Sequence, residues 1–317
     1  MPTAKTPRSG SLQFWPRKRA NKFLPSVNWS TIKKNSTKGL KGFICYKAGM
    51  ASGFVLDNTP DSMTKGKKII IPLTILECPK TKIFSVRFYK NGKVSKEILA
   101  KNLDKELKKV IKIPKKELSH EHLEHADKYD DVRVIIYSLV KSTGIKKTPD
   151  LSEVDLVGNL EEKLNFIKTN LHKEISALDT FEKGKLIDLR GLTKGKGLQG
   201  PVKRFGITLK SHKSEKGQRR PGSLGPWHPA RVTFRAPMAG QLGMFTRVVY
   251  NNKIVDLGNV EKNQNLKNIK NFGNIRTDYI LVRGSVPGPS KRQLLITPSF
   301  RETKKQAKKD FQLLELR

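Results

Sequence analysis

Positive charge is distributed very unevenly along this chain of 317 residues, and this distribution limits what the chain can fold into. The formal net charge is +36, from 64 Lys and Arg against 28 Asp and Glu. Residues 97–188 hold 17 of the basic and 18 of the acidic side chains, so this segment is nearly neutral. The other 225 residues hold 47 basic and 10 acidic side chains, a net +37. Because like charges oppose compaction, we expect a polyanion to neutralise these basic segments.

Several classes of protein are disfavoured by the composition. Cys45 and Cys78 are too few for a disulfide framework or a four-cysteine zinc site, so we expect two small core residues in a reducing compartment. The longest apolar run, residues 69–76, is far shorter than the roughly 20 residues of a membrane helix. Pro7 and Pro16 interrupt any amphipathic transit helix in the acid-free N-terminus. We therefore expect no membrane partner, no export and a cytoplasmic location.

The hydrophobic pattern predicts a mixed, mainly β fold. Short β-branched and aromatic runs separated by Gly and Asn predict antiparallel strands in residues 41–96 and again in 185–300, including one at 231–235. Helical spacing of apolar residues at 99–111 and 160–178, with a buried strand at 132–140 between them, predicts an α/β insertion. We therefore divide the chain into a basic N-terminal arm, a first β segment, a near-neutral α/β insertion, a second β segment and a basic C-terminal tail, at residues 1–40, 41–96, 97–184, 185–300 and 301–317.

Within the second β segment, residues 191–243 form a long stretch without helical or alternating pattern. It contains 10 Gly and 5 Pro in 53 residues. Residues 194–235 carry 11 Lys and Arg against one acid, Glu215. A structureless stretch of this length is usually functional or disordered. We interpret it as an extended basic loop whose glycines allow close approach to a phosphate chain.

Catalytic and metal-binding patterns are incomplete. Residues 195–200 match GxGxxG after a plausible strand, but no helical pattern follows Pro201 and Glu215 is a poor ribose ligand, so a nucleotide-binding enzyme is only an alternative. Residues 191–196 do not match a P-loop. The histidines His120, His122 and His125 lack the HExxH spacing, and a polar helix face explains them. We expect no enzyme activity, no cofactor and no metal.

All three tryptophans lie in basic, irregular segments: Trp15, Trp29 and Trp227. Aromatic rings among cations suit stacking on unpaired bases, worth about 1–3 kcal/mol per base. The alternative is that a tryptophan packs onto the protein's own core, above all Trp29. Extended basic arms also fit a permanent component of an RNA particle better than a free-standing DNA-binding protein, which stays a second alternative.

Five motifs carry a resemblance to a known family. They are GSLQFWPRKRA from Gly10, YKAGM from Tyr46, GLTKGKGLQGPVKRFG from Gly191, RRPGSLGPWHPARVTFRAPMAGQLG from Arg219 and DYILVRGSVPGP from Asp278. Together they closely resemble the universal large-subunit ribosomal protein L-three (L3) family in its archaeal/eukaryotic form. The motifs lie in the family's order from residue 10 to residue 289.

This resemblance implies a translation-protein type β-barrel built from 41–96 and 185–300, which binds large-subunit ribosomal RNA beside neighbouring ribosomal proteins. It implies a structural constituent of the large subunit that supports early assembly. The loop bearing Trp227 would reach toward the peptidyl-transferase centre. His212 is similar to a histidine that is methylated in some eukaryotic members, although the spacing to Trp227 is longer here. Leu198, Phe205 and the pair Met244-Phe245 replace the Phe, Trp and Tyr-His that the family leads us to expect.

Charge, aromatic character and resemblance together predict the RNA-binding residues. They are Trp15, Arg17, Lys18, Arg19, Lys194, Lys196, Gly197, Lys203, Arg204, His212, Arg219, Arg220, Trp227, His228, Arg231 and Arg235. Gly195 and Gly200 are predicted to allow close packing on the RNA backbone.

Overall fold

The computed structural model describes residues 14–32, 39–101, 103–114, 128–260 and 266–317. The chain divides into two compact units. We call Leu24–Gly191 with Val248–Arg317 the body, and Met1–Phe23 with Leu192–Arg247 the arm–loop unit. Strand exceeds helix in the described chain, so the predicted mixed, mainly β class is confirmed.

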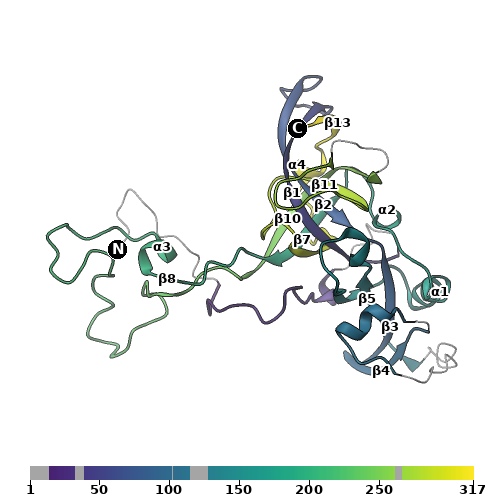
Figure 1. The fold of residues 1–317 in the computed structure, drawn as a ribbon, viewed down its shortest axis with the longest axis horizontal. Helices are drawn as coiled ribbons and strands as arrows, with labels where there is room; N and C mark the ends of the chain where they lie inside the picture. Colours follow the sequence, from purple (N-terminus) through teal and green to yellow (C-terminus); the bar gives the residue numbers. More distant parts are fainter. Residues whose placement is uncertain (1–13, 33–38, 102, 115–127, 261–265) are drawn as a thin grey trace. The chain divides into compact units, whose positions relative to one another are not determined.

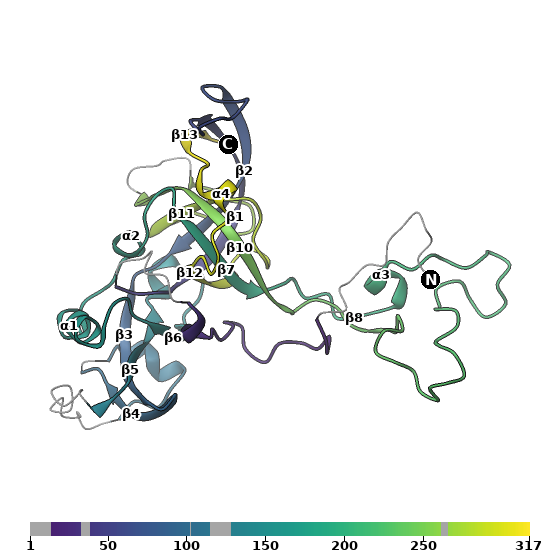
Figure 2. The same cartoon turned by 180° about the vertical axis from the view of Figure 1, so that it is seen from behind.

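Seven strands of the body form one sheet (Figures 1 and 2). In sheet order they are β12 Gln293–Pro298, β7 Leu186–Leu192, β10 Thr246–Gly258, β11 Asp278–Arg283, β2 Lys68–Cys78, β1 Phe43–Asp57 and β13 Phe311–Leu316. Because β1 also pairs with β12, the first six strands of this order are hydrogen-bonded in a ring. A ring of pairings is how a β-barrel removes its free edges. The translation-protein type of barrel stays a prediction.

Strand β1 pairs with three neighbouring strands, and its pairing is irregular. Its first residues pair with β12, its last residues pair with β13, and β2 runs along its other side. The register shifts between Lys47 and Gly49 and again between Phe54 and Val55. Such bulges bend a strand and increase its twist. The pairing of β13 also gives the predicted basic tail a regular structure, which its charge alone did not predict.

A second, four-stranded sheet has the order β4-β3-β5-β6. Its strands are β3 Thr81–Lys90, β4 Lys93–Leu99, β5 Asp131–Ser138 and β6 Leu151–Asp155. The sheet therefore starts at Thr81, before residue 97, where the change in net charge placed the start of the insertion. The physical reason is that strand pairing follows the alternation of apolar residues, and β3 belongs with β5 whatever the charge of its exposed side chains.

The helices in the described part of the body are short. They are η1 Trp29–Thr31, η2 Lys105–Lys109, η5 Val140–Thr143, α1 Leu160–Asn170, α2 Ala177–Thr180 and α4 Lys304–Ala307. The apolar spacing at 99–111 yields only the 3-10 helix η2, since Leu99 ends β4. The spacing at 160–178 yields two helices. Between them Ile175 exchanges two backbone hydrogen bonds with Thr81, of 2.8 and 3.0 Å, and so leaves the helical path.

Both faces of strand β11 are buried. In β11, Ile280 and Val282 join the core between the two sheets, whereas Tyr279 and Leu281 join a second core on the opposite face. A strand buried on both faces reads as a continuous apolar run, as the sequence 279–282 does. Cys45 and Cys78 are both buried and free, which confirms that they are small core residues.

A buried network of charges ties α1 to the sheets. The Nζ of Lys163 lies 2.6 Å from a carboxylate oxygen of Asp131 and 2.7 Å from one of Asp155, and Lys41 lies 2.7 Å from Asp155. Removing one partner of a buried network leaves an uncompensated charge, at a cost of about 3–5 kcal/mol. The network therefore fixes where the segment before β1 meets the insertion.

In the arm–loop unit, three short elements organise a long irregular chain. They are β8 Leu198–Gln199, α3 Pro201–Phe205 and β9 Gly240–Gln241, and β8 pairs with β9. Residues 206–239 contain no helix or strand, in agreement with the predicted irregular loop (Figure 1). The strand predicted at 231–235 is wrong. Its β-branched and aromatic residues are exposed there, so no core holds them in a sheet.

Candidate nucleic-acid interface

All of the predicted RNA-binding residues lie in the arm–loop unit. The unit contains 18 Lys and Arg, 6 in Met1–Phe23 and 12 in Leu192–Arg247, against the single acid Glu215. The predicted residues thus come from two segments almost 170 residues apart in the sequence. Their collection in one compact unit is a tertiary feature.

The base of the loop is a narrow antiparallel stem. The Thr193 amide donates to the Phe245 carbonyl at 3.0 Å, and Lys196 and Leu242 are joined in the same way at 3.0 Å. Gly243 makes this approach possible, because its φ is +79° and a Cβ there would overlap the Lys194 carbonyl oxygen. Such a residue must be glycine for both reasons.

The N-terminal arm lies against this stem. The Ala20 amide donates to the Met244 carbonyl at 3.0 Å. The Cζ of Arg17 lies 4.4 Å from the centroid of the Phe205 ring, and that of Arg204 lies 5.2 Å from the same ring. Each cation–π contact of this kind contributes about 0.5–2 kcal/mol. Phe205 is buried, so it acts as the small core on which arm and loop meet.

Arg204 has a structural task in addition to its predicted phosphate contact. Its Nε donates to the Gln241 carbonyl at 3.0 Å, and its Nη1 donates to the Met238 carbonyl at 2.9 Å. A Cβ at Gly240 would lie 3.0 Å from that Nη1, so this glycine makes room for the guanidinium. Desolvation lowers the pKa of Arg204 from its ordinary value. These bonds hold the return of the loop against α3.

The other predicted cations mostly face solvent. Arg17 is half-buried, and the exposed ones are Lys18, Arg19, Lys194, Lys196, Lys203, Arg219, Arg220, Arg231 and Arg235, together with His212 and His228. A Cβ at Gly197 or Gly200 would meet open space, whereas one at Gly195 would lie 3.1 Å from the Met244 side chain. The first two glycines therefore leave backbone open to a ligand, and Gly195 serves the stem instead.

The three tryptophans have different environments. Trp227 is 88% exposed and Trp15 is 65% exposed, with its ring centroid 5.6 Å from that of Phe234. Trp29 belongs to the body, is 3% exposed and donates its indole N–H to the Glu153 carbonyl at 3.1 Å. The alternative of core packing therefore holds for Trp29, and only Trp15 and Trp227 offer rings to a ligand.

The residues that depart from the expected family pattern differ in how deeply they are buried. Leu198 is 81% exposed, so it changes the outer surface of the loop. Phe205 is buried between two arginines and does not present its ring to a partner. Met244 has a φ of +56° in the stem, and Phe245 is half-buried next to Arg247.

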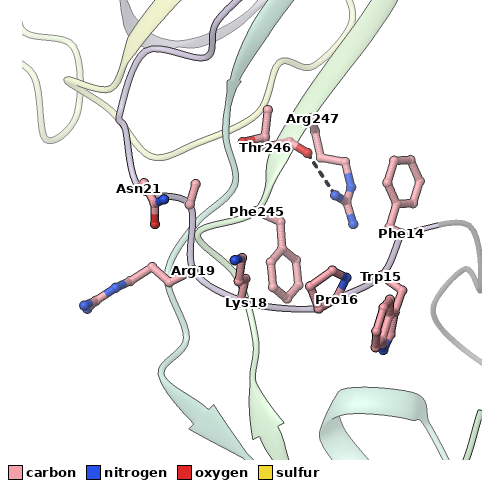
Figure 3. A pocket seen from close by; sticks show the side chains of 10 residues that line it. Phe14, Trp15, Pro16, Lys18, Arg19, Asn21, Phe245, Thr246 and Arg247 are labelled. Carbon is pink, nitrogen blue, oxygen red and sulfur yellow. Dashed lines mark hydrogen bonds between the residues drawn. The ribbon is translucent and has the colours of Figure 1, made fainter. Parts of the chain in front are cut away.

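A cavity of about 320 Å³ opens between the arm and the return strand of the loop (Figure 3). The part of its lining that the structure describes contains three aromatic rings, three cations and no carboxylate: Phe14, Trp15, Pro16, Lys18, Arg19, Ala20, Asn21, Phe245, Thr246 and Arg247. Phe14, Phe245 and Arg247 were not among the predicted residues. The signal was present in the sequence as aromatics next to cations, at Phe14-Trp15 and Phe245-Thr246-Arg247, but these pairs are far apart in the chain.

The described structure adds no support for a dinucleotide site, a metal site or a membrane-spanning helix. The GxGxxG segment does open a helix at Pro201, contrary to expectation, but α3 has five residues and follows a two-residue antiparallel strand. A dinucleotide site needs a parallel strand and a long helix. His120, His122 and His125 lie outside the described residues, and within the described residues no group of three His, Cys, Asp or Glu could hold a metal ion. No described helix has the length and apolar character to cross a membrane.

Comparison with known proteins bears on the whole chain. The uL3 protein of the large ribosomal subunit from Methanocaldococcus jannaschii is 40% identical over 309 residues, which are 93% of this chain and 91% of that protein. The uL3 protein from Archaeoglobus fulgidus is 40% identical over 310 residues, covering 94% and 93%. That from Methanothrix thermoacetophila is 38% identical over 315 residues, covering 95% and 93%. Residues 1–315 match the family model for ribosomal protein L3, and the chain therefore belongs to the ribosomal protein L3 family, whose members are structural constituents of the ribosome and not enzymes.

Proposed function

We propose that this protein is a structural component of the large ribosomal subunit in the cytoplasm, and that its arm–loop unit binds large-subunit ribosomal RNA. The observation that carries the proposal is the collection of 18 basic residues, against one acid, in a unit with little regular structure. Phosphate contacts supply most of the affinity of such a surface, and extended segments order as they bind. The L3 relatives are named as proteins of the large ribosomal subunit, which fits this partner better than DNA.

In this proposal the body and the arm–loop unit have different tasks. The body is a packed scaffold whose described residues form three hydrophobic clusters, and neighbouring ribosomal proteins would contact its surface. The arm–loop unit neutralises RNA and supports early assembly of the subunit. Trp227, which is almost fully exposed beside His228, marks the tip that reaches toward the peptidyl-transferase centre.

Assembly is the first test. Replacing Arg219, Arg220 and Arg231 together by Gln removes three exposed cations without touching a described core. We expect less incorporation into large subunits and an accumulation of precursor particles on sucrose gradients. The matched control replaces Lys105, Lys108 and Lys112 by Gln, which are exposed cations of the near-neutral insertion. Equal incorporation of the two triple variants would contradict RNA binding by the arm–loop unit.

The tip is tested separately. Trp227→Ala removes an exposed ring and should leave incorporation into subunits intact. We expect altered translational fidelity or altered response to drugs that bind near the peptidyl-transferase centre. Ribosomes that carry the variant and translate normally, with unchanged drug response, would refute the role of the tip.

A further inference from the structure

The cavity between the arm and the loop has the chemistry of a nucleotide site. Phe14, Trp15 and Phe245 supply ring faces, while Lys18, Arg19 and Arg247 supply positive charge. No Asp or Glu is among the described residues that line it, so its charge complements an anion. A volume of about 320 Å³ is at the small end of the pockets that hold ligands. These features together favour one planar, negatively charged unit.

Arg247 is already held in position for such a ligand. Its Cζ lies 3.9 Å from the centroid of Phe14 and 5.3 Å from that of Phe245, and its Nη1 donates to the Thr246 carbonyl at 2.9 Å. Figure 3 shows the guanidinium between these two rings. A planar cation that is fixed before binding loses little entropy when a base stacks beside it. Desolvation lowers the pKa of Arg247, in agreement with its half-buried position.

The rim of the cavity differs from its aromatic wall. Lys18 and Arg19 are exposed and can reach a phosphate, and the amide of Asn21 can hydrogen-bond to a base edge. Phe14 is about half exposed, and Trp15 more so, although Arg247 and Phe234 lie against them. Ring faces of this kind are accessible to a base that has left its stack and not to a base inside a duplex.

We propose that this cavity binds one unpaired nucleotide of the RNA, with its base among the rings of Phe14, Trp15 and Phe245 and its phosphate on Lys18 and Arg19. This site deepens the proposed function and rests on it. The arm would then recognise a bulged or flipped base, in addition to the phosphate backbone that the loop contacts. Phe245 matters here because the resemblance led us to expect histidine, which would add a titratable group beside Arg247.

The experiment uses the full chain and two RNA hairpins that differ only in a single-nucleotide bulge carrying 2-aminopurine. We expect the bulged hairpin to bind about tenfold more tightly than the fully paired one, the value of one stacked base. Binding should also quench the fluorescence of the 2-aminopurine. Phe14→Ala should remove the preference and the quenching while leaving affinity for the paired hairpin unchanged, which shows that the variant is folded. The matched control is Phe23→Ala, an exposed arm residue that does not line the cavity.

The outcomes separate the two proposals. Absence of binding to both hairpins in moderate salt would refute RNA binding itself. Equal binding to both hairpins, or a preference that survives Phe14→Ala, would refute the nucleotide site alone. A third arm adds free adenosine monophosphate. Displacement of the bulged hairpin by comparable concentrations of this nucleotide would show a site for free nucleotides and would overturn the assignment to RNA.

Discussion

At the scale of single residues, glycine and tryptophan show how environment decides the meaning of a residue type. Gly243 permits the stem of the loop, whereas Gly197 and Gly200 face open space. Trp29 is a core residue with a satisfied indole N–H, whereas Trp227 presents its ring to solvent. The sequence shows the same residue types in similar basic surroundings. The difference lies in which segment comes close in space.

Gly243→Ala should open the stem locally. The left-handed backbone conformation costs a non-glycine residue about 1–2 kcal/mol, and the added Cβ also overlaps the Lys194 carbonyl. We expect the amides of Lys196 and Leu242 to exchange hydrogen at least about fivefold faster, the factor that 1 kcal/mol represents. Gly200→Ala, at a φ of −70° with open space around it, is the control. Similar exchange in both variants would contradict the role of Gly243.

The tryptophans provide a second test at this scale. Trp29→Ala should lower the free energy of unfolding by about 3–5 kcal/mol, because it empties part of the core and removes the indole hydrogen bond to the Glu153 carbonyl. Trp227→Ala should change it by less than about 0.5 kcal/mol, since the ring is exposed. Urea denaturation of the two variants measures both values. An equal loss of stability would mean that Trp227 is also packed.

At the scale of elements, β2 and the residues before β11 share an unusual carboxylate. One oxygen of Glu77 accepts hydrogen bonds from the amides of Arg276 and Thr277, at 2.8 and 3.2 Å. The other oxygen is buried and has no hydrogen-bond partner among the described residues. Burial raises the pKa of Glu77 above its ordinary value of 4.5. The folded protein therefore binds this proton more tightly than the unfolded chain does.

This difference predicts a pH dependence of stability. As pH rises from 4.5 through the raised pKa, the folded state must surrender a proton that the unfolded chain has already lost, so the stability of the wild type falls over that range. Glu77→Gln keeps an acceptor oxygen and removes the charge. We expect the variant to gain stability relative to the wild type at pH 7, and the gain to shrink as the pH is lowered toward 4.5. A difference that does not change with pH, measured by urea denaturation, would contradict this account.

At the scale of the whole molecule, paired charges and uncompensated charges lie in different segments of the chain. The near-neutral part of the chain folds into sheets and helices in which many carboxylates pair with cations, and the pairs of Asp155 with Lys41 and Lys163 are buried. In the arm–loop unit the single acid cannot neutralise 18 cations. The first kind of charge stabilises the fold, and the second is available to a polyanion.

The salt dependence of RNA binding measures this division. Each phosphate contact on single-stranded RNA contributes about 0.7 to the slope of log K against log salt, and about 0.9 on a duplex. Replacing Arg219, Arg220 and Arg231 by Gln should therefore reduce the magnitude of the slope by about 2–3. The variant with Lys105, Lys108 and Lys112 replaced by Gln should keep the wild-type slope. A shallower slope in that control would place RNA contacts on the insertion as well.

The amino-acid sequence by itself determined the fold class, the irregular basic loop, the family and the two small core cysteines. These follow from local pattern, composition and motif order, which need no knowledge of distant contacts. Tertiary structure decided the rest. It assigned β3 and β4 to the second sheet, ended the helical spacing where Ile175 meets Thr81, buried Trp29, and brought Phe14 and Phe245 to one cavity with Arg247. Each of these depends on contacts between residues far apart in the chain, whose free energy outweighs the local preference of either partner.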